Sequence, residues 1–563
     1  MAAAATAARG APAAAAAVAP VSAATAPPVP AGDILVIGLG ESGRAVAEYV
    51  LGKTDGRFGS VTIVDAADTP TLREAAKKLV ALGARVFLGR SRIDAGVVGA
   101  SEAEGALEAT DALEADNMFE GTGVREADNT FDLCVASPGI PPHSDLAGWA
   151  SGVSARMISE IEFAYLESLQ AGSPQAESSE AGSPQAGSSQ AWIAVTGTNG
   201  KTTTTALIAH LFRAGDVLAR AVGNIGEPAI SAVAAAGAAG AAEAAGADVV
   251  LVAEISSFQL ALTEAFHPRV AVLLNITPDH IDWHGSMAGY MRDKARVFEN
   301  LTSADCAILN VDDDLTRSLL PTVAKTGARV IRVSATPGTE AEGFVENGRL
   351  TLTTANGERF ALAGAEELQV KGRHNITNAL AAAAAGFSFG LSPEALRRGL
   401  TSFEPIEHRL EPVGSAAGAE WFNDSKATNP DAVRKALDAF GDRPLIVLLG
   451  GRNKDNDFSL LATDVARRVR VAVLFGESAA ELAEAFDACD GGGVGAGADD
   501  RLTVFNADTL AEAVGLAAKA AVPGDAVVLS PACASFDEFR NYEERGRVFK
   551  ALVKEVAAKG ERR

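Results

Sequence analysis

The sequence predicts an α/β protein with three α/β domains, and three observations lead to that prediction. Along most of the 563 residues, short apolar runs of strand length alternate with helical patterns, as they do in proteins built around parallel sheets. Two of these apolar runs end in Gly-rich turns that open directly into a helical pattern. The length is also sufficient for about three or four domains.

The composition limits the classes of partner and compartment. The net charge of -23 excludes the broad basic surface that nucleic-acid binding requires, whereas small phosphorylated molecules fit if Lys and Arg gather locally. No apolar run approaches the length of a membrane span. The four cysteines are widely spaced without a Cys-x-x-Cys pair, so we expect a reducing compartment and no disulfide framework or zinc site. Cys134 lies in an apolar run and is expected in a core.

Low-complexity stretches divide the chain. Residues 1–31 are rich in Ala and Pro, with a single Arg and no strongly apolar segment, which predicts a disordered tail rather than a secretion signal. An acidic stretch at about 94–129 is expected to be an inserted loop. Residues 170–190 contain Ala-Gly-Ser-Pro-Gln-Ala twice and predict a flexible linker. The predicted domains are residues 32–169, 191–405 and 406–563.

The first domain begins with a dinucleotide-type fingerprint. An apolar strand at 33–38 runs into the turn Gly38-Leu39-Gly40-Glu41-Ser42-Gly43, and a helix is expected at about 42–51. The strand 61–64 then ends in Asp65, an acid about 20 residues further on. Taken alone, this pattern predicts NAD binding. A further strand, 133–136, leads into Ser137.

The second domain begins with a phosphate-binding loop. The apolar strand 192–196 is followed by Gly197-Thr198-Asn199-Gly200-Lys201-Thr202, with a helix expected from near Thr203. Glycines let backbone amides close around phosphate oxygens, and the helix N-terminus adds partial positive charge. Lys201 can reach the outer phosphates and the Thr202 hydroxyl can bind Mg²⁺. The loop is compressed, because Val195 occupies the place of the usual first glycine. It predicts ATP or GTP binding.

Polar side chains follow the next strands of this domain. Glu254 comes after the apolar run 249–253 and is placed to hold Mg²⁺, although a lone glutamate there is more often solvated. His280 lies in a polar strand end and is a candidate ligand for a second metal ion. Lys294 belongs to a helical pattern at 290–298, and from that pattern alone we expect a solvated helix residue.

The third domain carries further polar blocks at strand ends, where open α/β sheets bind ligands. Residues 423–430 follow a short apolar strand and precede a helix with Pro430 near its start. Within this block, Asp424 and Lys426 are suited to contact ribose and phosphate. Residues 530–537 lie where another strand enters a helix. Each block alone is compatible with ordinary turn chemistry, but together they favour a site of several parts. The domain also contains His408, Arg409, Arg452 and Lys454 in predicted turns.

Together, these motifs resemble the Mur ligase family, with folylpolyglutamate synthase as a more distant relative. The resemblance covers roughly residues 32–554 apart from the low-complexity stretches. The blocks that carry it are 197–204, 254–260, 275–280, 372–379 and His408-Arg409.

The resemblance implies an ATP-dependent amide ligase of peptidoglycan precursor synthesis. Blocks 423–429 and 530–535, followed by Arg545-Gly546, resemble the family members that add D-glutamate to UDP-N-acetylmuramoyl-L-alanine through an acyl phosphate. The implied fold has an N-terminal Rossmann-like domain that binds UDP instead of NAD, a central ATPase domain with a mainly parallel sheet, and a C-terminal Rossmann-like domain. A cytoplasmic monomer with no nucleic-acid partner and no membrane span is expected.

The resemblance also implies roles for individual residues. Contacts with ATP are implied for Gly197, Thr198, Asn199, Gly200, Lys201, Thr202, Thr203, Asn378, Arg409 and Asp424. Contacts with the UDP substrate are implied for Leu39, Gly40, Glu41, Ser42, Asp65, Ser137, Asn224, Ser256 and Gln259. Contacts with D-glutamate are implied for Lys426, Thr428, Lys454, Ser535, Phe536 and Tyr542. The implied catalytic residues are Lys201, Glu254, His280 and Lys294. Two Mg²⁺ sites are implied, with ligands from Thr202, Glu254, His280 and Lys294, the last as a carbamate.

The chain departs from the family pattern at two places. Tyr542 stands where the family often has Phe, and Ala66 and Ala67 replace polar residues that some members carry at the uracil end. Three alternatives stay open from the sequence. One is another amide ligase of the same superfamily. The others are an NAD-dependent oxidoreductase with an accessory ATPase domain and a non-catalytic nucleotide switch.

Overall fold

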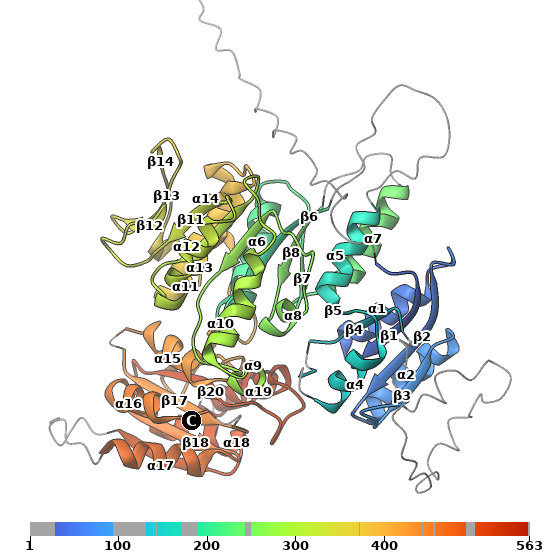
Figure 1. The fold of residues 1–563 in the computed structure, drawn as a ribbon. Coiled ribbons are helices and arrows are strands. Elements are labelled where there is room, and N and C mark those ends of the chain that lie inside the picture. The colour runs from blue at the N-terminus through green and yellow to red at the C-terminus, as the bar shows by residue number, and fades with distance from the viewer. Residues whose placement is uncertain are drawn as a thin grey trace, which may run out of the picture. The chain divides into compact units, whose positions relative to one another are not determined.

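The computed structural model confirms the α/β architecture, with helices alternating with strands that form three sheets (Figure 1). The predicted tail, acidic insert and linker lie outside the described residues, apart from 29–31, 170–171 and 190. The structure describes residues 29–93, 131–138, 140–141, 144–171, 190–242, 249–370, 372–441, 443–453, 456–490 and 502–560.

The chain forms two compact units, each discontinuous in sequence. One comprises residues 1–332 and 382–396, and the other comprises residues 333–381 and 397–563. The predicted domain boundaries near residues 169, 190 and 405 stay predictions.

The first sheet is entirely parallel, in the order β3-β2-β1-β4-β5. The central strand, β1, is an apolar run whose last four residues are buried, as expected for a strand covered on both faces. Cys134 is buried here, which confirms its expected place in a core. The strands are β1 (Gly32–Ile37), β2 (Phe58–Asp65), β3 (Arg85–Leu88), β4 (Leu133–Ala136) and β5 (Met157–Ser159), and the helices are α1 (Glu41–Leu51), α2 (Pro70–Ala81), α4 (Asp145–Val153) and α5 (Glu160–Ala171).

The second sheet has nine strands in the order β14-β13-β12-β11-β10-β9-β6-β8-β7. The pairs around β6 are parallel, whereas β12, β13 and β14 form an antiparallel meander. The strands are β6 (Ala191–Thr196), β7 (Ala219–Gly223), β8 (Val250–Glu254), β9 (Val270–Leu273), β10 (Cys306–Asn310), β11 (Arg329–Val333), β12 (Gly343–Glu346), β13 (Arg349–Thr353) and β14 (Arg359–Gly364).

The helices of this part of the chain follow their strands after short turns. The expected helix at 290–298 begins earlier, at Met287, because the Ser286 side chain accepts a hydrogen bond from the Gly289 amide and caps it. The helices are α6 (Lys201–Ala214), α7 (Ala229–Ala242), α8 (Ser257–Ala261), α9 (Ile281–His284), α10 (Met287–Ala295), α11 (Asp314–Ser318), α12 (Leu320–Ala324), α13 (Arg373–Ser388) and α14 (Pro393–Ser402), with 3₁₀ turns η1 (Arg296–Phe298) and η2 (Ala365–Glu367).

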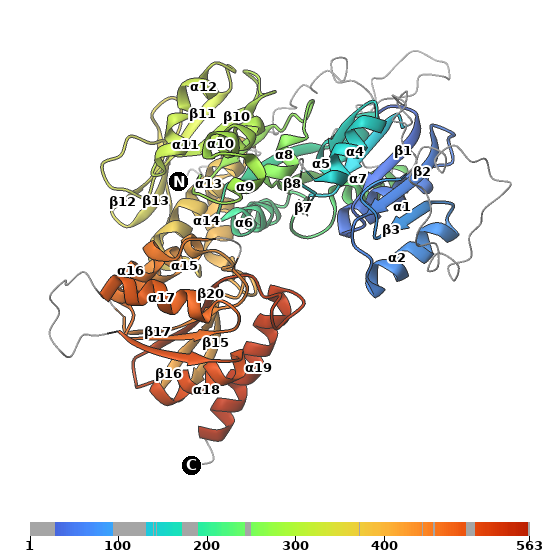
Figure 2. The ribbon, with the colours of Figure 1, turned by 60° about the horizontal axis from the view of Figure 1, so that its bottom comes forward.

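The third sheet, in the order β15-β16-β20-β17-β18-β19, is parallel except for the β15–β16 hairpin. Helices cover both of its faces (Figure 2). Along β17, Leu445, Val447 and Leu449 face the core beneath α15–α17, whereas Ile446 and Leu448 face the core beneath α18 and α19. The elements are β15 (Glu411–Ala416), β16 (Ala419–Asn423), α15 (Pro430–Asp438), β17 (Leu445–Gly450), α16 (Ser459–Arg468), β18 (Val471–Phe475), α17 (Ala479–Asp490), β19 (Thr503–Ala507), α18 (Leu510–Ala520), β20 (Ala526–Ala532) and α19 (Tyr542–Gly560).

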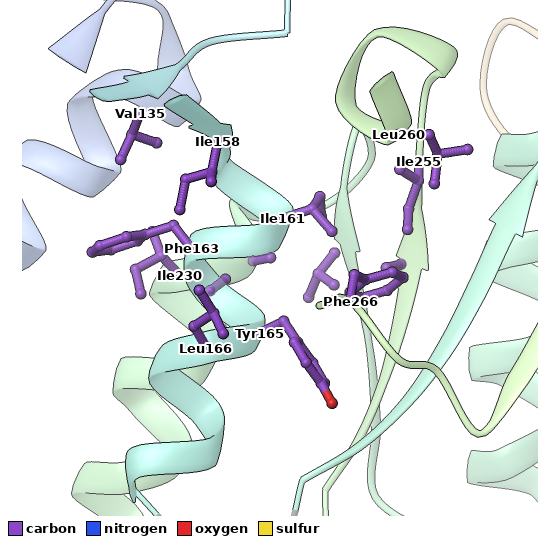
Figure 3. Close-up of a cluster of buried hydrophobic side chains, with 14 of the residues drawn as sticks. Val135, Ile158, Ile161, Phe163, Tyr165, Leu166, Ile230, Ile255, Leu260 and Phe266 are labelled. Atoms are coloured by element: carbon purple, nitrogen blue, oxygen red, sulfur yellow. The ribbon is translucent and has the colours of Figure 1, made fainter. Parts of the chain in front are cut away.

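Helix α5 joins the first sheet to the second within one compact unit (Figure 3). Its side chains Ile161 and Tyr165 enter an apolar cluster with Ile230 of α7 and Phe266 of the second sheet's loops. The rings of Tyr165 and Phe266 meet edge to face, with centroids 5.4 Å apart. The first residue of α5, Glu160, is also fully buried, and its Oε1 accepts a hydrogen bond of 2.9 Å from the Ile230 amide.

Glu160 gives this junction a predicted pH dependence. Burial raises the pKa of its carboxyl from 4.5 to about 7, against two backbone amides that lower it. The folded chain therefore binds more protons than the unfolded chain between these values, and its free energy of unfolding falls as the pH rises through that window. Glu160→Gln keeps an oxygen acceptor but cannot ionise. We expect the difference in melting temperature, Glu160→Gln minus the unchanged chain, to increase between pH 4.5 and about 7 and then to level off. A pH-independent difference in thermal unfolding would contradict this account.

Candidate active site

The phosphate-binding loop at 197–202 is held in shape by the end of the neighbouring strand. The Asn275 carbonyl accepts from the Thr198 amide at 2.9 Å, and the Asn275 side chain exchanges two hydrogen bonds with the backbone of Asn199. Gly197 and Gly200 have φ values of 153° and 84°, which favour glycine. At Gly197, an added Cβ would also lie 3.0 Å from the Leu274 Cβ. The compressed loop is therefore built for close packing against β9.

Two lysine amines converge on one carbonyl of this loop. Lys201, the first residue of α6, donates from Nζ to the carbonyls of Gly197 and Thr198 at 2.9 Å each. Lys294 of α10 donates to the same Gly197 carbonyl at 2.8 Å. Burial, together with the nearby Lys201 charge, holds the pKa of the Lys294 amine well below its ordinary value. The structure thus brings Lys294 to the phosphate loop from another helix.

The prediction that Lys294 is a solvated helix residue is wrong. Its side chain is only 1% exposed. The helical pattern could not reveal this burial. The buried side chain that α10 contributes here is polar, and it contacts the backbone of the phosphate loop. Periodicity identifies a buried face only when that face is apolar.

Glu254 ends β8 with a buried carboxylate. The residue is 5% exposed, and its Oε2 has no hydrogen-bond partner among the described residues. Glu254 is therefore not the solvated strand-end carboxylate that is commoner at such positions. A buried acceptor left open costs stability unless something binds it. Carboxylate and hydroxyl oxygens are the ligands that Mg²⁺ prefers, so Glu254, together with the buried Thr202 on α6, fits a magnesium ion.

His280 lies at the beginning of α9, with a left-handed φ of 53°. Its ring packs against Phe258, with centroids 4.8 Å apart, and its side chain is 40% exposed. The carboxylates of the adjacent Asp279 and of Glu254 both act to raise the pKa of the Lys294 amine, against the larger effect of burial. The segment that carries His280 is thus close to the buried lysine, and the ring itself is open to solvent.

Three residues implied for the UDP substrate gather beside Glu254. The Asn224 amide donates to the Glu254 carbonyl at 3.1 Å. Ser256 and Gln259 form a capping box at the start of α8, in which each side chain accepts from the other's backbone amide. Gln259 is buried and its Nε2 finds no partner among the described residues. The side chains of Ser256 and Gln259 are thus held in place by hydrogen bonds to each other's backbone.

At the first sheet, the Gly-rich turn is braced by the residues implied to contact the ligand. Asp65 accepts from the Leu39 amide at 2.6 Å and from the Ala67 amide at 2.8 Å. Ser137 donates from Oγ to the Gly38 carbonyl at 2.8 Å. Gly43 has no room for a side chain, because an added Cβ would lie 2.0 Å from that carbonyl. The N-terminus of α1, with Gly40, Glu41 and Ser42, follows this turn and carries no side-chain cap, as an anion site requires.

In the second compact unit, a pocket lies beside Asp424. Its apolar walls include Val370, Leu410, Phe422 and Phe440, and Asn375 and Arg409 add polar groups. Asn378 donates to the Asn375 side chain at 3.1 Å. A pocket with apolar walls and a few polar groups suits an aromatic base.

Asp424 itself is buried. Its carboxylate accepts from the Ser530 hydroxyl at 2.7 Å and from the Leu410 amide at 3.3 Å. Burial raises the pKa of the Asp424 carboxyl to about 7, although the Ser530 bond and the charge of Arg409 lower it. The carboxylate therefore joins the end of β20 to the loop that carries Arg409.

Four of the residues implied for D-glutamate follow strands β16 and β20 of the third sheet, and a fifth, Tyr542, begins α19; the four are Lys426, Thr428, Ser535 and Phe536. Lys426 Nζ sits 5.1 Å from the Tyr542 ring centroid, and the Thr428 amide donates to the Lys426 carbonyl at 2.9 Å. Ser535 is buried, whereas Phe536 is 58% exposed. Lys454 lies outside the described residues.

Arg545 is a structural centre of this region that the sequence patterns did not reveal. The guanidinium is fully buried and donates to the Ser425 hydroxyl at 3.0 Å and to the carbonyls of Ser425, Cys533 and Ala534 at 2.9, 3.1 and 3.2 Å. Burial lowers the pKa of the guanidinium to about 10. Arg545 therefore ties the loop after β16 to the end of β20. The only sequence signal was its place beside Gly546 in the family pattern, since an Arg in a helix is ordinarily solvated.

Among the described residues, one cluster of His and carboxylate side chains has the spacing of metal ligands, and it is formed by Glu407, His408 and Glu411. Lys550 offsets part of the negative charge of this cluster, since its Nζ donates to Glu407 at 2.6 Å and to Glu411 at 2.9 Å. Asn423 donates to both His408 and Glu411. The cluster is therefore a structural network that supports the segment containing Arg409.

The mainly parallel sheet carries a phosphate loop at its strand ends, and the Glu254 carboxylate has an oxygen available to a cation. These features define a nucleotide-binding α/β protein suited to phosphate chemistry with a divalent cation. Among the described residues, no helix combines the length and apolar character needed to cross a membrane.

Comparison with known proteins assigns the family. Residues 195–386 match the Mur ligase middle domain, and residues 408–533 match the Mur ligase glutamate ligase domain. Over 520 residues, the chain is 37% identical to the UDP-N-acetylmuramoylalanine–D-glutamate ligase of Pelotomaculum thermopropionicum, covering 92% of this chain and 97% of that protein. The protein of the same name from Koribacter versatilis is 33% identical over 527 residues, covering 93% and 97%. The chain belongs to the Mur ligase family.

Solved structures agree with the fold. The UDP-N-acetylmuramate-alanine ligase of Thermotoga maritima aligns with a TM-score of 0.51 at 16% identity, covering 93% of this chain and 99% of that chain. A pseudomurein peptide ligase type C from Methanothermus fervidus aligns with a TM-score of 0.50 at 16% identity and the same coverage. At this identity the likeness extends to the fold alone.

Proposed function

We propose that this protein is an ATP-dependent ligase that joins D-glutamate to UDP-N-acetylmuramoyl-L-alanine in the synthesis of the peptidoglycan precursor. The observation that carries the proposal is the convergence of Lys201 and Lys294 on one carbonyl of the phosphate loop, with the buried carboxylate of Glu254 close enough to act on the Lys294 amine. The chain places this convergence in a fold whose relatives of 37% and 33% identity carry the D-glutamate ligase name. The Gly-rich turn of the first sheet then serves a UDP diphosphate instead of NAD.

The reaction has two chemical steps. The L-alanine carboxylate of the substrate attacks the γ-phosphorus of ATP, ADP leaves, and an acyl phosphate forms. The amine of D-glutamate then attacks the acyl carbon, loses a proton, and expels phosphate from a tetrahedral intermediate. Most of the rate comes from positioning and from neutralising phosphate charge.

The chain's residues have distinct parts in these steps. The amides at the start of α6 and the Lys201 amine hold the outer phosphates. Asn378, Arg409 and Asp424 bind the adenosine end, and the base lies against the apolar walls of the pocket that Asn375 and Arg409 also line. The strand-end loops tied by Arg545 present the groups that bind D-glutamate.

Glu254 and Thr202 would hold the first Mg²⁺, and His280 with a carbamylated Lys294 would hold the second. When bound, the ions supply positive charge that offsets the negative charge of the phosphates during transfer. Both sites are proposals, as are a monomeric state, a cytoplasmic location and the lack of a nucleic-acid partner.

The environment of Lys294 supports carbamylation. A carbamate forms when a neutral amine attacks CO₂: the N–C bond forms, a proton leaves, and the side chain becomes an anion. The depressed pKa of the buried amine favours the neutral form. The nearby Lys201 cation also favours an anion over a second cation at this position.

The substrate is tested by a panel of amino acids. Purified protein with ATP, Mg²⁺ and UDP-N-acetylmuramoyl-L-alanine should release phosphate when D-glutamate is added, and much less with L-alanine, L-lysine or diaminopimelate. Lys201→Met should lose at least about 100-fold in kcat, because one charge that holds the outer phosphates is removed. Phosphate release that depends on L-lysine or diaminopimelate would overturn the proposed substrate.

The carbamate is tested by removing CO₂. We expect turnover to fall in CO₂-depleted buffer and to return when bicarbonate is added, with a carbamate ¹³C resonance in ¹³C-bicarbonate that is lost in Lys294→Arg. That variant keeps a cation but its guanidinium does not form the carbamate, so it is the matched control. Full activity of Lys294→Ala, or turnover indifferent to bicarbonate, would show that Lys294 does not act in this form.

A further inference from the structure

A buried Ser–His–Asp relay lies beside the phosphate site. His284, the last residue of α9, contacts the Asp293 carboxylate through Nδ1 at 2.7 Å and the Ser257 hydroxyl through Nε2 at 2.9 Å. A carboxylate only accepts, so Nδ1 is the donor, and in the neutral ring the Ser257 hydroxyl donates to Nε2. Both ring nitrogens are therefore satisfied.

The relay connects two of the elements that carry proposed metal ligands, the segment after β8 and helix α10. Ser257 is the first residue of α8, three positions after Glu254 at the end of β8. Asp293 immediately precedes Lys294 in α10. Through these two hydrogen bonds, the His284 ring holds the segment of Glu254 and the helix of Lys294 at a set separation.

Aromatic rings fix the plane of the imidazole. The Phe258 ring stacks on it at an angle of 13° with centroids 5.6 Å apart, and the Tyr290 ring lies 5.0 Å away. The Tyr290 hydroxyl is 3.0 Å from the Thr198 hydroxyl of the phosphate loop. The His284 ring is thus packed between α8 and α10 and is linked through Tyr290 to the phosphate loop.

The arrangement resembles a nucleophilic triad, but its burial excludes that role. Ser257, His284 and Asp293 are 3%, 9% and 8% exposed. A substrate carbonyl has no access to a hydroxyl buried in this way, and the reaction needs no enzyme nucleophile. The relay acts through the groups that it holds.

We propose that His284 is a positioning residue that sets the relative geometry of the two proposed divalent-cation sites by holding Glu254 of one and Lys294 of the other in register. The inference rests on the proposed function, since it concerns the cations of that same active site. Partners that orient metal ligands typically change metal affinity by 10- to 100-fold when they are removed. The structure assigns this task to one ring that bridges two separate elements.

The experiment measures metal binding directly and does not rely on activity alone. Mn²⁺ binding to the full chain, with bicarbonate and a non-hydrolysable ATP analogue present, is followed by the electron paramagnetic resonance of free Mn²⁺. We expect His284→Ala to raise the Mn²⁺ dissociation constant about tenfold. The half-saturating Mg²⁺ concentration in turnover should rise to a similar extent, while KM for D-glutamate changes by less than about twofold. A merely structural role would move all of these quantities together.

The chain offers a matched control. His267 also pairs with a buried aspartate, with its Nε2 2.7 Å from Asp305, but this pair lies before β9 and β10, at the opposite ends of the strands from the phosphate loop. His267→Ala should leave Mn²⁺ affinity unchanged. If His284→Ala does not fold, Ser257→Ala takes its place, because it removes a single hydrogen bond and carries the same expectation.

The results separate the two claims. If Ser257 acts only through His284, removing both side chains has the same effect as removing His284. The double variant Ser257→Ala/His284→Ala should therefore bind Mn²⁺ no more weakly than His284→Ala alone. Mn²⁺ affinity within twofold of the unchanged chain in a folded His284 or Ser257 variant would overturn the inference, as would equal weakening by His267→Ala. Tight Mn²⁺ binding by a chain without D-glutamate-dependent turnover would contradict the proposed function alone.

Discussion

The active-site region depends on one carbonyl, that of Gly197, which accepts hydrogen bonds from both Lys201 and Lys294. Lys294 is 1% exposed, and burial disfavours the charged form of its amine. The nearby Lys201 charge adds to this effect, so the pKa of the Lys294 amine lies well below its ordinary value. The Lys201 cation and an amine that favours its neutral form therefore share one acceptor in the loop proposed to bind phosphates.

Hydrogen bonds from the surrounding residues hold the phosphate loop, Glu254 and Lys294 in place. Asn275 closes the compressed loop from the neighbouring strand, and the His284 relay joins the elements of Glu254 and Lys294. In the third sheet, the buried Arg545 serves a comparable purpose by joining two strand-end loops through carbonyls instead of a carboxylate. In both regions, groups buried within the scaffold hold the residues proposed to touch the substrates.

The sequence predicted best the parts that depend on local pattern. The strands at 133–136 and 471–475 coincide with the observed β4 and β18, because they are apolar runs buried on both faces. The solvated position expected for Lys294 was wrong, because its buried face meets polar backbone. The role of His284 lay beyond any local pattern, since its partners are 9 and 27 residues away along the chain and only the fold brings them together.

The proposed ligase reaction requires that a carboxylate oxygen of the substrate attack ATP at this loop before the amide bond forms. The most direct measurement uses UDP-N-acetylmuramoyl-L-alanine labelled with ¹⁸O in both oxygens of its alanine carboxylate. Mass spectrometry of the phosphate released in the presence of D-glutamate should find one ¹⁸O atom per phosphate, because the oxygen that attacked phosphorus leaves with it. Unlabelled phosphate from a reaction that forms the amide product would contradict the account.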